Sequence, residues 1–227
     1  MYIKIHISFV VNILKSYLTC IYNKKHLSMA AVLKWKIYKS AAYVQSKAYD
    51  KSKGGFTIKQ ACMSSDAESY DYANQPNDTE LGYLRETLRH VNEIVKTFEE
   101  NNDKYGVWIE SGYRSECVNN VVGGSPYSGH RVGGAVDLKV YRKSDYKTSY
   151  TYDKDNPTEL LLKTAAKYIS DNSIEYNEFL REIKGGGYWF HLAITGNGGN
   201  KNKWTYTLGS GKKNYMDNYY GLTYKHP

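Results

Sequence analysis

Apolar residues recur every three or four positions between residues 79 and 101, the spacing of one face of an α-helix. The recurring positions are Leu81, Leu84, Leu88, Val91, Ile94, Val95 and Phe98. The pattern predicts a long amphipathic helix that Asp78 or Thr79 caps at its start. A second helix is predicted from Pro157 to about Ser170, because proline favours the first helical position and apolar residues follow at helical spacing.

Short apolar segments predict strands. Residues 107–109 form one apolar run, and apolar residues alternate with others over 136–140. Two further runs, 179–183 and 188–194, are separated by the three glycines of 185–187. A glycine turn between two such runs predicts an antiparallel pair. The chain therefore mixes helices and strands.

The glycines that end Lys51-Ser-Lys-Gly-Gly55 predict a linker, and we place a domain boundary there. Residues 1–54 are then an N-terminal extension, residues 55–195 the main domain, and residues 196–227 a tail rich in Gly, Asn, Lys and Tyr. The tail forms one more hairpin or stays flexible. Residues 142–156 are polar and rich in tyrosine, which predicts an exposed loop or hairpin.

The N-terminus contains an apolar stretch within residues 1–22 that Asn12 and Lys15 interrupt. The stretch is shorter than the ~20 residues of a membrane-spanning helix, and no small-residue cleavage site follows it. Three interpretations stay open: a weak signal or membrane anchor, a biological start at Met29, and a plain amphipathic helix.

The formal net charge is +8 and the isoelectric point is about 9.1. A basic surface suits nucleic acid, a membrane surface or an anionic cell wall, but it also occurs on proteins without an acidic partner. Charge alone does not select among these. The three cysteines, Cys20, Cys62 and Cys117, form no Cys-x-x-Cys pair, so a zinc site built from cysteines is not expected.

Two histidines stand in settings that suit a metal site. His130 lies in a glycine-rich loop, and His191 lies in the predicted strand 188–194. Asp137 lies at the start of the strand that follows His130. Catalytic zinc commonly takes three His or carboxylate ligands and keeps a fourth position for water. These residues are therefore candidate zinc ligands, and the glycines before Asp137 would let the backbone pass close to the metal.

Five motifs occur in order along the chain: Ser111-Gly-Tyr-Arg-Ser115, Gly123-Gly-Ser-Pro126, Ser128-Gly-His130, Asp137 and Trp189-Phe-His191. Over residues 56–195 they resemble the zinc D-alanyl-D-alanine carboxypeptidase family, including its His-to-Asp spacing. Members of this family include vancomycin-resistance dipeptidases and phage endolysins, and the fold is shared with the Hedgehog signalling domain. The resemblance implies an α+β fold of this Hedgehog and DD-peptidase type, with helices flanking a central antiparallel sheet.

The resemblance also implies roles for the motif residues. His130, Asp137 and His191 would hold zinc. Arg114 would hold the substrate or the oxyanion that forms at the scissile carbonyl, because a guanidinium is permanently charged and donates twice to one group. Ser128 would contact the substrate.

The general base is assigned by resemblance to the phage-type branch. The segment Tyr176-Asn-Glu-Phe-Leu-Arg-Glu182 resembles the stretch that leads to a Glu in that branch, so Glu182 is the candidate and Glu178 the runner-up. The chain departs from the family pattern at Asn177. It departs again at Tyr188, three residues before the last zinc histidine, where several relatives carry a carboxylate.

Pairing across the glycine turn gives these residues an expected geometry. Glu182 and His191 become near-opposite neighbours, with Cβ atoms about 5 Å apart if they share a face. Tyr188 would sit on the far face from His191, because an odd offset along a strand reverses the side-chain direction.

Three classes of function remain. The first is a zinc peptidase that cuts stem peptides of peptidoglycan, as a carboxypeptidase or as an endopeptidase. The second is a non-catalytic module that contains zinc and binds the cell wall or a protein. Glu182 discriminates between these two, because a binding module needs no buried carboxylate facing the metal. The third is a nucleic-acid binder, which would use the Lys and aromatic residues of 201–206 and 212–215.

The first class is the leading hypothesis. It predicts zinc as the cofactor, a peptidoglycan peptide as the substrate and anionic wall polymer as a further partner. Nucleic acid is not the expected partner, a membrane contact is left open, and a monomer is expected. The protein would face the cell wall or periplasm, or be a phage-encoded lysin or virion-associated enzyme.

Overall fold

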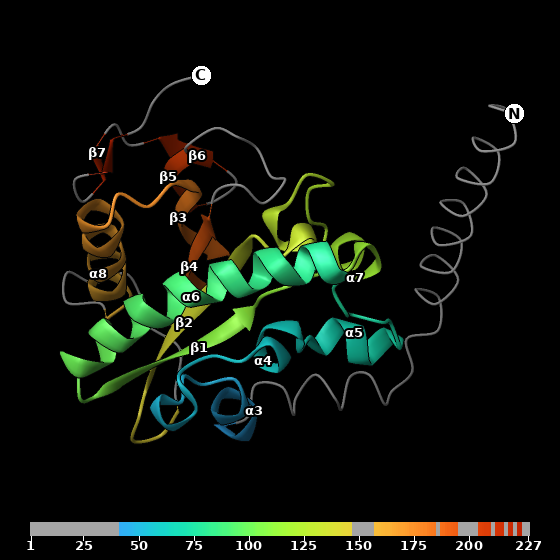
Figure 1. Ribbon diagram of the computed structural model, residues 1–227, viewed down its shortest axis with the longest axis horizontal. Coiled ribbons are helices and arrows are strands. Elements are labelled where there is room, and N and C mark those ends of the chain that lie inside the picture. The colour runs from blue at the N-terminus through green and yellow to red at the C-terminus, as the bar shows by residue number, and fades with distance from the viewer. Residues whose placement is uncertain are drawn as a thin grey trace, which may run out of the picture.

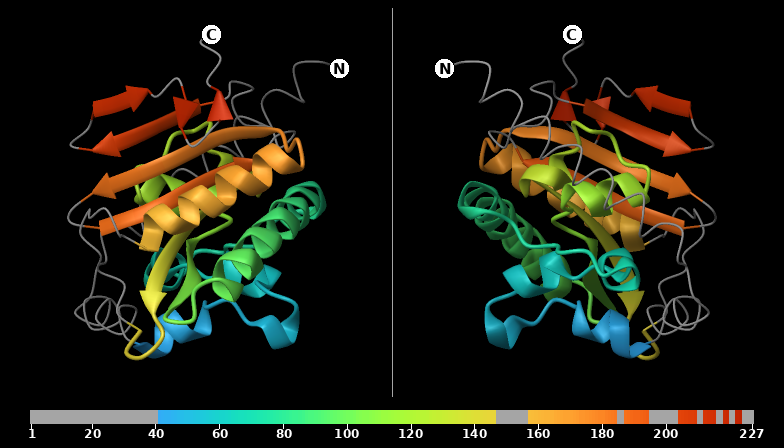
Figure 2. Two further views of the ribbon diagram at one scale, coloured as in Figure 1. Left: turned by 90° about the vertical axis from the view of Figure 1, so that its left-hand side faces the viewer. Right: turned by 90° about the vertical axis from the view of Figure 1, so that its right-hand side faces the viewer.

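The computed structural model describes residues 41–146, 157–184 and 187–194, together with short strands between residues 204 and 223. Six strands form one sheet in the order β1-β2-β4-β3-β5-β6 (Figure 2). They are β1 (Tyr105–Ser111), β2 (Ala135–Arg142), β3 (Tyr176–Lys184), β4 (Gly187–Ile194), β5 (Trp204–Gly209) and β6 (Lys212–Tyr215). A separate pair comprises β7 (Asn218–Tyr219) and β8 (Leu222–Thr223).

The helices differ widely in length. They are α3 (Ala41–Ser46), α4 (Ile58–Cys62), α5 (Ser65–Tyr70), α6 (Asp78–Glu100), α7 (Glu116–Val121) and α8 (Pro157–Asp171). Two 3-10 turns are η1 (Lys51–Lys53) and η2 (Gly129–Val132). Helices α6 and α8 contact each other and pack against the sheet (Figure 1). The strands β1, β2, β4 and β3 are antiparallel neighbours, whereas β5 runs parallel to β3. The α+β fold expected from the sequence is confirmed.

Alternation along the strands separates the core from the opposite face of the sheet. Leu138, Phe190 and Leu192 are fully buried in the core beneath the two long helices. Burying an apolar side chain of this size contributes roughly 1.5–3 kcal/mol, so this face supplies much of the driving force for folding. Asp137 and His191 alternate with these residues and therefore point to the other face.

The long helix begins with a reciprocal cap. The Asn77 side chain accepts a hydrogen bond from the Glu80 backbone N–H (3.0 Å), and the Glu80 carboxylate accepts one from the Asn77 N–H (2.9 Å). This arrangement satisfies two backbone donors that a helix start leaves unpaired. The helix predicted over 79–101 is confirmed, but its cap is Asn77 rather than Asp78 or Thr79.

The predicted pair of C-terminal strands is also confirmed as the antiparallel neighbours β3 and β4. The expectations for residues 1–40 and for most of the loop 142–156 fall outside the described residues. Within the described part of the chain, no helix is long and apolar enough to cross a membrane.

Residues before and after the expected main domain of 55–195 contact it or extend its sheet. The segment before residue 55 contacts the first strand, because the Tyr49 N–H donates to the Val107 carbonyl (2.8 Å) and the Ile109 N–H donates to the Lys47 carbonyl (3.1 Å). At the other end of the sheet, β5 and β6 continue it beyond residue 195 (Figure 2). The domain boundaries at 54 and 195 stay predictions, since no comparison tests them.

Candidate active site

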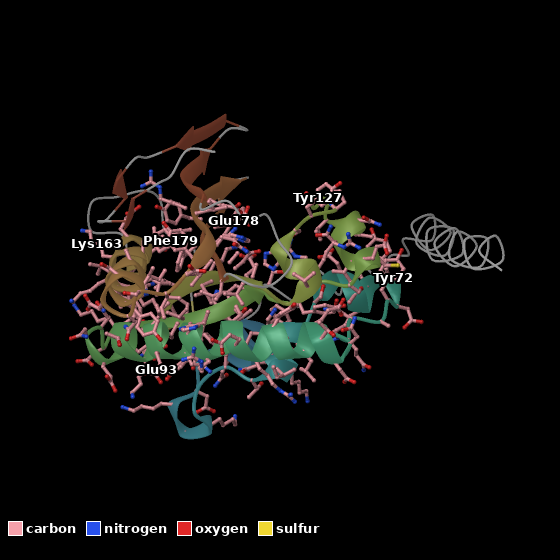
Figure 3. The ribbon with its side chains drawn as sticks, turned by 45° about the horizontal axis from the view of Figure 1, so that its top comes forward. Tyr72, Glu93, Tyr127, Lys163, Glu178 and Phe179 are labelled. Carbon is pink, nitrogen blue, oxygen red and sulfur yellow. The ribbon has the colours of Figure 1, made fainter. Side chains whose placement is uncertain are left out.

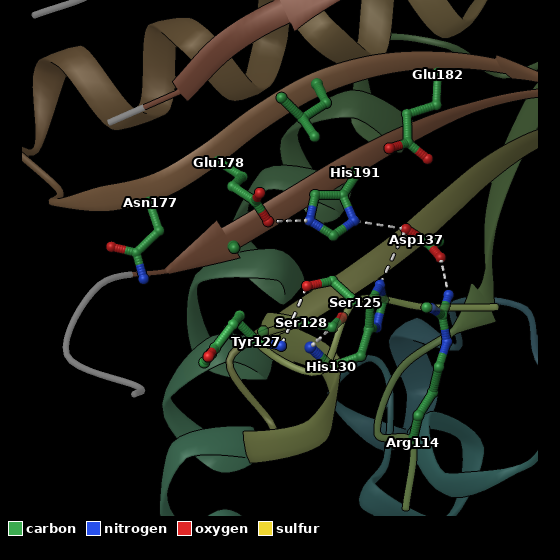
Figure 4. A pocket seen from close by; sticks show the side chains of 14 residues that line it. Arg114, Ser125, Tyr127, Ser128, His130, Asp137, Asn177, Glu178, Glu182 and His191 are labelled. Atoms are coloured by element: carbon green, nitrogen blue, oxygen red, sulfur yellow. Dashed lines mark hydrogen bonds and ion pairs between the residues drawn. The ribbon is translucent and has the colours of Figure 1, made fainter. Parts of the chain in front are cut away.

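A pocket of about 270 Å³ opens on the face of the sheet opposite the core (Figure 4). It lies between strands β2, β3 and β4 and the loop that follows α7. The lining includes Arg114, Ser125, Tyr127, Ser128, His130, Asp137, Asn177, Glu178, Glu182 and His191. Every residue that the sequence assigned to the site therefore lines one pocket.

His130 enters the pocket from the turn η2. Its Nδ1–H donates to the Gly112 carbonyl (2.6 Å), so Nε2, which lies 3.3 Å from Oδ1 of Asp137, is the ring nitrogen that a metal could bind. Burial and the nearby Arg114 charge lower the pKa of His130, although Asp137 opposes them. A neutral imidazole with its Nε2 lone pair directed at Asp137 is the form that binds a metal.

Gly133, one of the two glycines before Asp137, has a packing role. Gly133 ends η2 in the left-handed conformation, with φ of 78°. A Cβ atom there would lie 2.4 Å from the Glu80 carbonyl oxygen of α6. The residue therefore lets the His130 turn pack closely against the first turns of α6. The expectation that the two glycines let the backbone pass close to the metal stays a prediction.

Asp137 and His191 face each other directly across β2 and β4. Nδ1 of His191 lies 2.8 Å from Oδ1 of Asp137. Burial acts to raise the pKa of Asp137, but His130, His191 and Arg114 outweigh it, and the pKa falls well below its usual value. Burial acts to lower the pKa of His191, but hydrogen bonds to Asp137 and Glu178 outweigh it, and the pKa rises well above its usual value.

The donor set fits zinc. One ligand atom each from His130, Asp137 and His191 lies within 4.8 Å of the others, and all three residues are buried. Two ligands at about 2.0–2.1 Å from a tetrahedral zinc lie about 3.3 Å apart, close to the 3.3 Å and 2.8 Å separations here. Two imidazoles and one carboxylate form one of the usual ligand sets of catalytic zinc.

Arg114 is fixed at the wall of the pocket. Its Nε–H donates to the Ser111 hydroxyl (2.7 Å), and Nη2 donates to Oδ2 of Asp137 (2.6 Å). Its backbone N–H donates to the His130 carbonyl (3.0 Å). The guanidinium thus holds one carboxylate oxygen of Asp137 and leaves Oδ1 for the two histidines.

The two glutamates of β3 contact different groups. Oε2 of Glu178 lies 3.0 Å from Nε2 of His191, on the side of the ring away from Asp137. Glu182 lines the same pocket but pairs across the strands with Trp189, and Leu180 stands opposite His191. The expected near-opposite pair of Glu182 and His191 is therefore wrong by two residues.

The register explains this shift. Lys184 pairs with Gly187, whereas Glu182 would stand opposite His191 only if Lys184 paired with Trp189, two residues further along β4. Glu182 still shares the pocket face with His191, as a diagonal neighbour.

Ser128 and Tyr188 are the two remaining residues that the sequence analysis singled out. Ser128 lines the pocket, and its hydroxyl accepts a hydrogen bond from the His130 N–H (3.4 Å). Tyr188 lies on the far face, as expected, and its hydroxyl donates to Glu159 of α8, which also accepts from Arg181. Tyr188 therefore anchors β4 to a helix instead of standing in for the carboxylate that relatives carry at this position.

A comparison with models of known protein families identifies the family of this chain. The model of the family Peptidase M15 matches residues 55–170. The chain belongs to the Peptidase M15 family. Peptidases of this family are zinc-dependent, and His130, Asp137 and His191 form a possible metal site whose donor atoms suit zinc. Among curated proteins, no sequence matches this chain.

The M15 match contains only part of the site. It includes His130 and Asp137 but ends before β3 and β4, which contribute Glu178, Glu182 and His191. The structure supplies this second half, because strand pairing brings β4 next to β2.

Several residues of the site were not assigned to it from the sequence, among them Gly112, Tyr127 and Asn177. The Gly112 carbonyl orients His130, and only its position inside the Ser111-Gly-Tyr-Arg-Ser115 motif pointed to it. Tyr127 is 77% exposed and lines the pocket (Figure 3). Asn177 was noted only as a departure from the family pattern, yet it too lines the pocket.

Proposed function

We propose that this M15 metallopeptidase hydrolyses peptide bonds in the stem peptides of peptidoglycan. The observation that carries the proposal is the convergence of His130, Asp137 and His191 in a pocket that Arg114 and Glu182 also line. Family membership supports the zinc chemistry. The motifs around the site support the substrate, because they resemble those of wall peptidases.

In the proposed reaction His130, Asp137 and His191 would hold zinc, which would supply Lewis-acid activation of water and of the scissile carbonyl. Glu182 acts as the general base: its carboxylate takes a proton from the attacking water and passes it to the leaving amine. Burial raises the pKa of Glu182 above its usual value, with His191 opposing and Asp137 adding to the shift. A raised pKa suits this role, since proton transfer is most efficient when the pKa of the base is near the working pH.

Arg114 and Ser128 act on the substrate in this proposal. The guanidinium stabilises the negative charge that develops on the carbonyl oxygen, in a partly buried site where electrostatic interactions are strong. It is already fixed by Asp137 and Ser111, so little reorganisation is needed when the charge forms. The Ser128 hydroxyl contacts the peptide at the pocket wall.

Glu178 orients a ligand rather than serving as the base. Its carboxylate accepts a hydrogen bond from Nε2–H of His191, which leaves Nδ1 of that ring for the metal. A carboxylate behind a metal-binding histidine fixes the tautomer and the ring orientation. Glu182, which makes no such contact with the ring, remains available for proton transfer.

The charge of the protein fits the same proposal. A net charge of +8 favours contact with anionic wall polymer, which would raise the local concentration of enzyme on its substrate. We place its action at the cell wall, as a wall-facing bacterial enzyme, a phage lysin or a virion-associated enzyme, and as a monomer.

Digestion of purified peptidoglycan tests the proposal. Zinc-loaded protein should release products that mass spectrometry identifies by their new amino and carboxyl ends, and a chelator should stop the release until zinc is restored. Release of a single terminal amino acid indicates a carboxypeptidase, and release of longer peptides indicates an endopeptidase. Binding to peptidoglycan without any product would instead identify a non-catalytic wall-binding module.

A further inference from the structure

Strand β3 contains a bulge at the edge of the pocket. Tyr176 pairs with Ile194 of β4, whereas Glu178 pairs with the adjacent Ala193, so Asn177 is an extra residue on β3. Regular alternation would place Asn177 on the core face with Phe179. The bulge instead turns its side chain into the pocket, beside Glu178 (Figure 4). Bulges next to active sites re-aim side chains in this way.

The carboxamide of Asn177 differs from those of the other buried asparagines. Asn74 donates to the Cys62 and Tyr113 carbonyls and accepts from the Ser115 N–H, and Asn119 donates to the Ser125 carbonyl. Asn177 is only 5% exposed, yet its side chain makes no hydrogen bond with another described residue. The amide atoms of Asn177 are not among the buried side-chain atoms that lack a partner, so they reach the space of the pocket, where water or a ligand can pair with them.

The surroundings define the kind of group that this amide receives. A carboxamide presents donors and an acceptor side by side, which matches the C=O and N–H of a peptide group. Glu178 is the neighbouring residue, and Glu182 and Asp137 line the same pocket, so a free carboxylate of the substrate would be repelled there. Arg114, the one Arg or Lys among the described lining residues, lies on the other side of His191 from Asn177 (Figure 4).

We propose that Asn177 binds an uncharged backbone peptide group of the substrate, on the side of the metal site opposite Arg114. The inference rests on the proposed function, since it assigns one wall of that active site to the peptide chain flanking the scissile bond. Asn177 is then a specificity residue at the bulge of β3.

A binding measurement tests the inference without turnover. The probe is the synthetic peptide L-Ala-D-Glu-L-Lys-D-Ala-D-Ala, titrated by calorimetry into zinc-loaded Glu182→Gln protein. Adding Asn177→Ala should raise the Kd about 3- to 10-fold, as expected for the loss of a neutral hydrogen bond. Asn177→Asp keeps the shape and places a second carboxylate beside Glu178, so it should weaken binding further. Asn172→Ala, at the exposed end of α8, should leave the Kd unchanged.

The kinetic counterpart uses Asn177→Ala and Asn177→Asp in the otherwise native protein, with zinc content and melting temperature measured in parallel. The KM for the peptides of digested peptidoglycan should rise, while kcat and zinc content stay close to native, because a lost binding contact acts on KM. If both variants fold, hold zinc and keep the native KM and Kd, the inference is overturned.

The same measurements separate this inference from the proposed function. Native protein that cleaves peptidoglycan while both Asn177 variants behave as native overturns the role of Asn177 alone. Native protein that cleaves no wall peptide overturns the proposed function. In that event an Asn177-dependent Kd for the probe peptide still supports peptide binding at this wall, and a probe that does not bind overturns both.

Discussion

Glu178 and Glu182 lie four residues apart on one face of β3, but they contact different partners. Glu178 is hydrogen-bonded to the outer nitrogen of His191, whereas Glu182 lines the pocket beside it. One carboxylate is therefore placed to orient a ligand and the other to move a proton. These roles predict different results for the same chemical change, from Glu to Gln.

Glu182→Gln removes the proposed base and keeps the shape of the side chain. Zinc content should stay at the native level, because Glu182 is not among the ligands. Hydrolysis of peptidoglycan should fall by about 10²- to 10⁴-fold, the usual contribution of a general base. Native rates in this variant would show that the base lies elsewhere in the pocket.

Glu178→Gln should instead weaken zinc binding, by about 10-fold or more, because it removes the charge behind His191. Competition with a chelator measures the zinc affinity. Excess zinc should restore most of the hydrolysis, which it cannot do for Glu182→Gln. The matched control is Glu175→Gln, at an exposed position just before β3. Native zinc affinity in Glu178→Gln would contradict the orienting role.

At the scale of elements, the turn η2 connects the metal site to the long helix α6. Gly133 allows this contact for two reasons. Its backbone adopts the left-handed conformation, and it has no side chain in the space next to α6. Gly54 has nearly the same φ, 77° against 78°, but among the described residues no atom other than those of its chain neighbours lies within 4 Å of the place where its Cβ would be. The two glycines therefore separate the cost of backbone conformation from the cost of close packing.

Gly133→Ala should lower the free energy of unfolding more than Gly54→Ala does. The backbone cost alone is about 1–2 kcal/mol at each site, and only Gly133 adds the clash with Glu80. Urea unfolding measures both variants. Zinc affinity should also fall in Gly133→Ala, since the His130 turn has to move. Equal losses of stability would show that the packing against α6 is loose.

The elements were more predictable from the sequence than their register. Helix α6 and the strands β3 and β4 follow from apolar spacing, because each buries one face or stripe. The pairing of Glu182 with Trp189, and the bulge at Asn177, follow from how the strands meet in three dimensions. The apolar pattern of each strand is the same in either register. The residues that lie opposite His191 could therefore not be predicted from that pattern.

In the candidate site, too, some features were predictable from the sequence and others were not. The candidate zinc ligands were predicted because histidine and aspartate stand in motifs with a known spacing, and the structure brings these residues together. The contacts that orient them, from the Gly112 carbonyl and from Glu178, depend on the tertiary structure. The roles of Arg114, Ser128 and Glu182 stay predictions until the variants are measured.

At the scale of the whole molecule, Lys47 joins the segment before residue 55 to the domain. Its side chain is fully buried, and Nζ donates to the carbonyls of Met63 (2.8 Å) and Glu110 (2.9 Å). Burial lowers the pKa of Lys47 to about 8, although Glu110 and Asp137 oppose the shift. A charged group in this position couples the stability of the whole fold to pH.

The sign of this coupling follows from proton binding. Between about pH 8 and 10.5 the unfolded chain keeps a proton on Lys47 that the folded protein has lost, so stability rises with pH across this window. Relative to Lys47→Met, the native protein should gain roughly 3 kcal/mol from the lower to the upper limit, at 1.36 kcal/mol per pKa unit. Urea unfolding at several pH values measures the difference. Parallel profiles for the two proteins would show that Lys47 keeps its ordinary pKa.

The central claim is that one zinc ion at His130, Asp137 and His191 makes the protein a hydrolase of wall peptides. The most direct measurement adds zinc stepwise to metal-free protein and follows the hydrolysis of purified peptidoglycan. The account predicts that the rate rises in proportion to zinc and levels off at about one ion per chain, and that His191→Ala shows no rise. A rate that does not depend on zinc, or one bound zinc without hydrolysis, would contradict it.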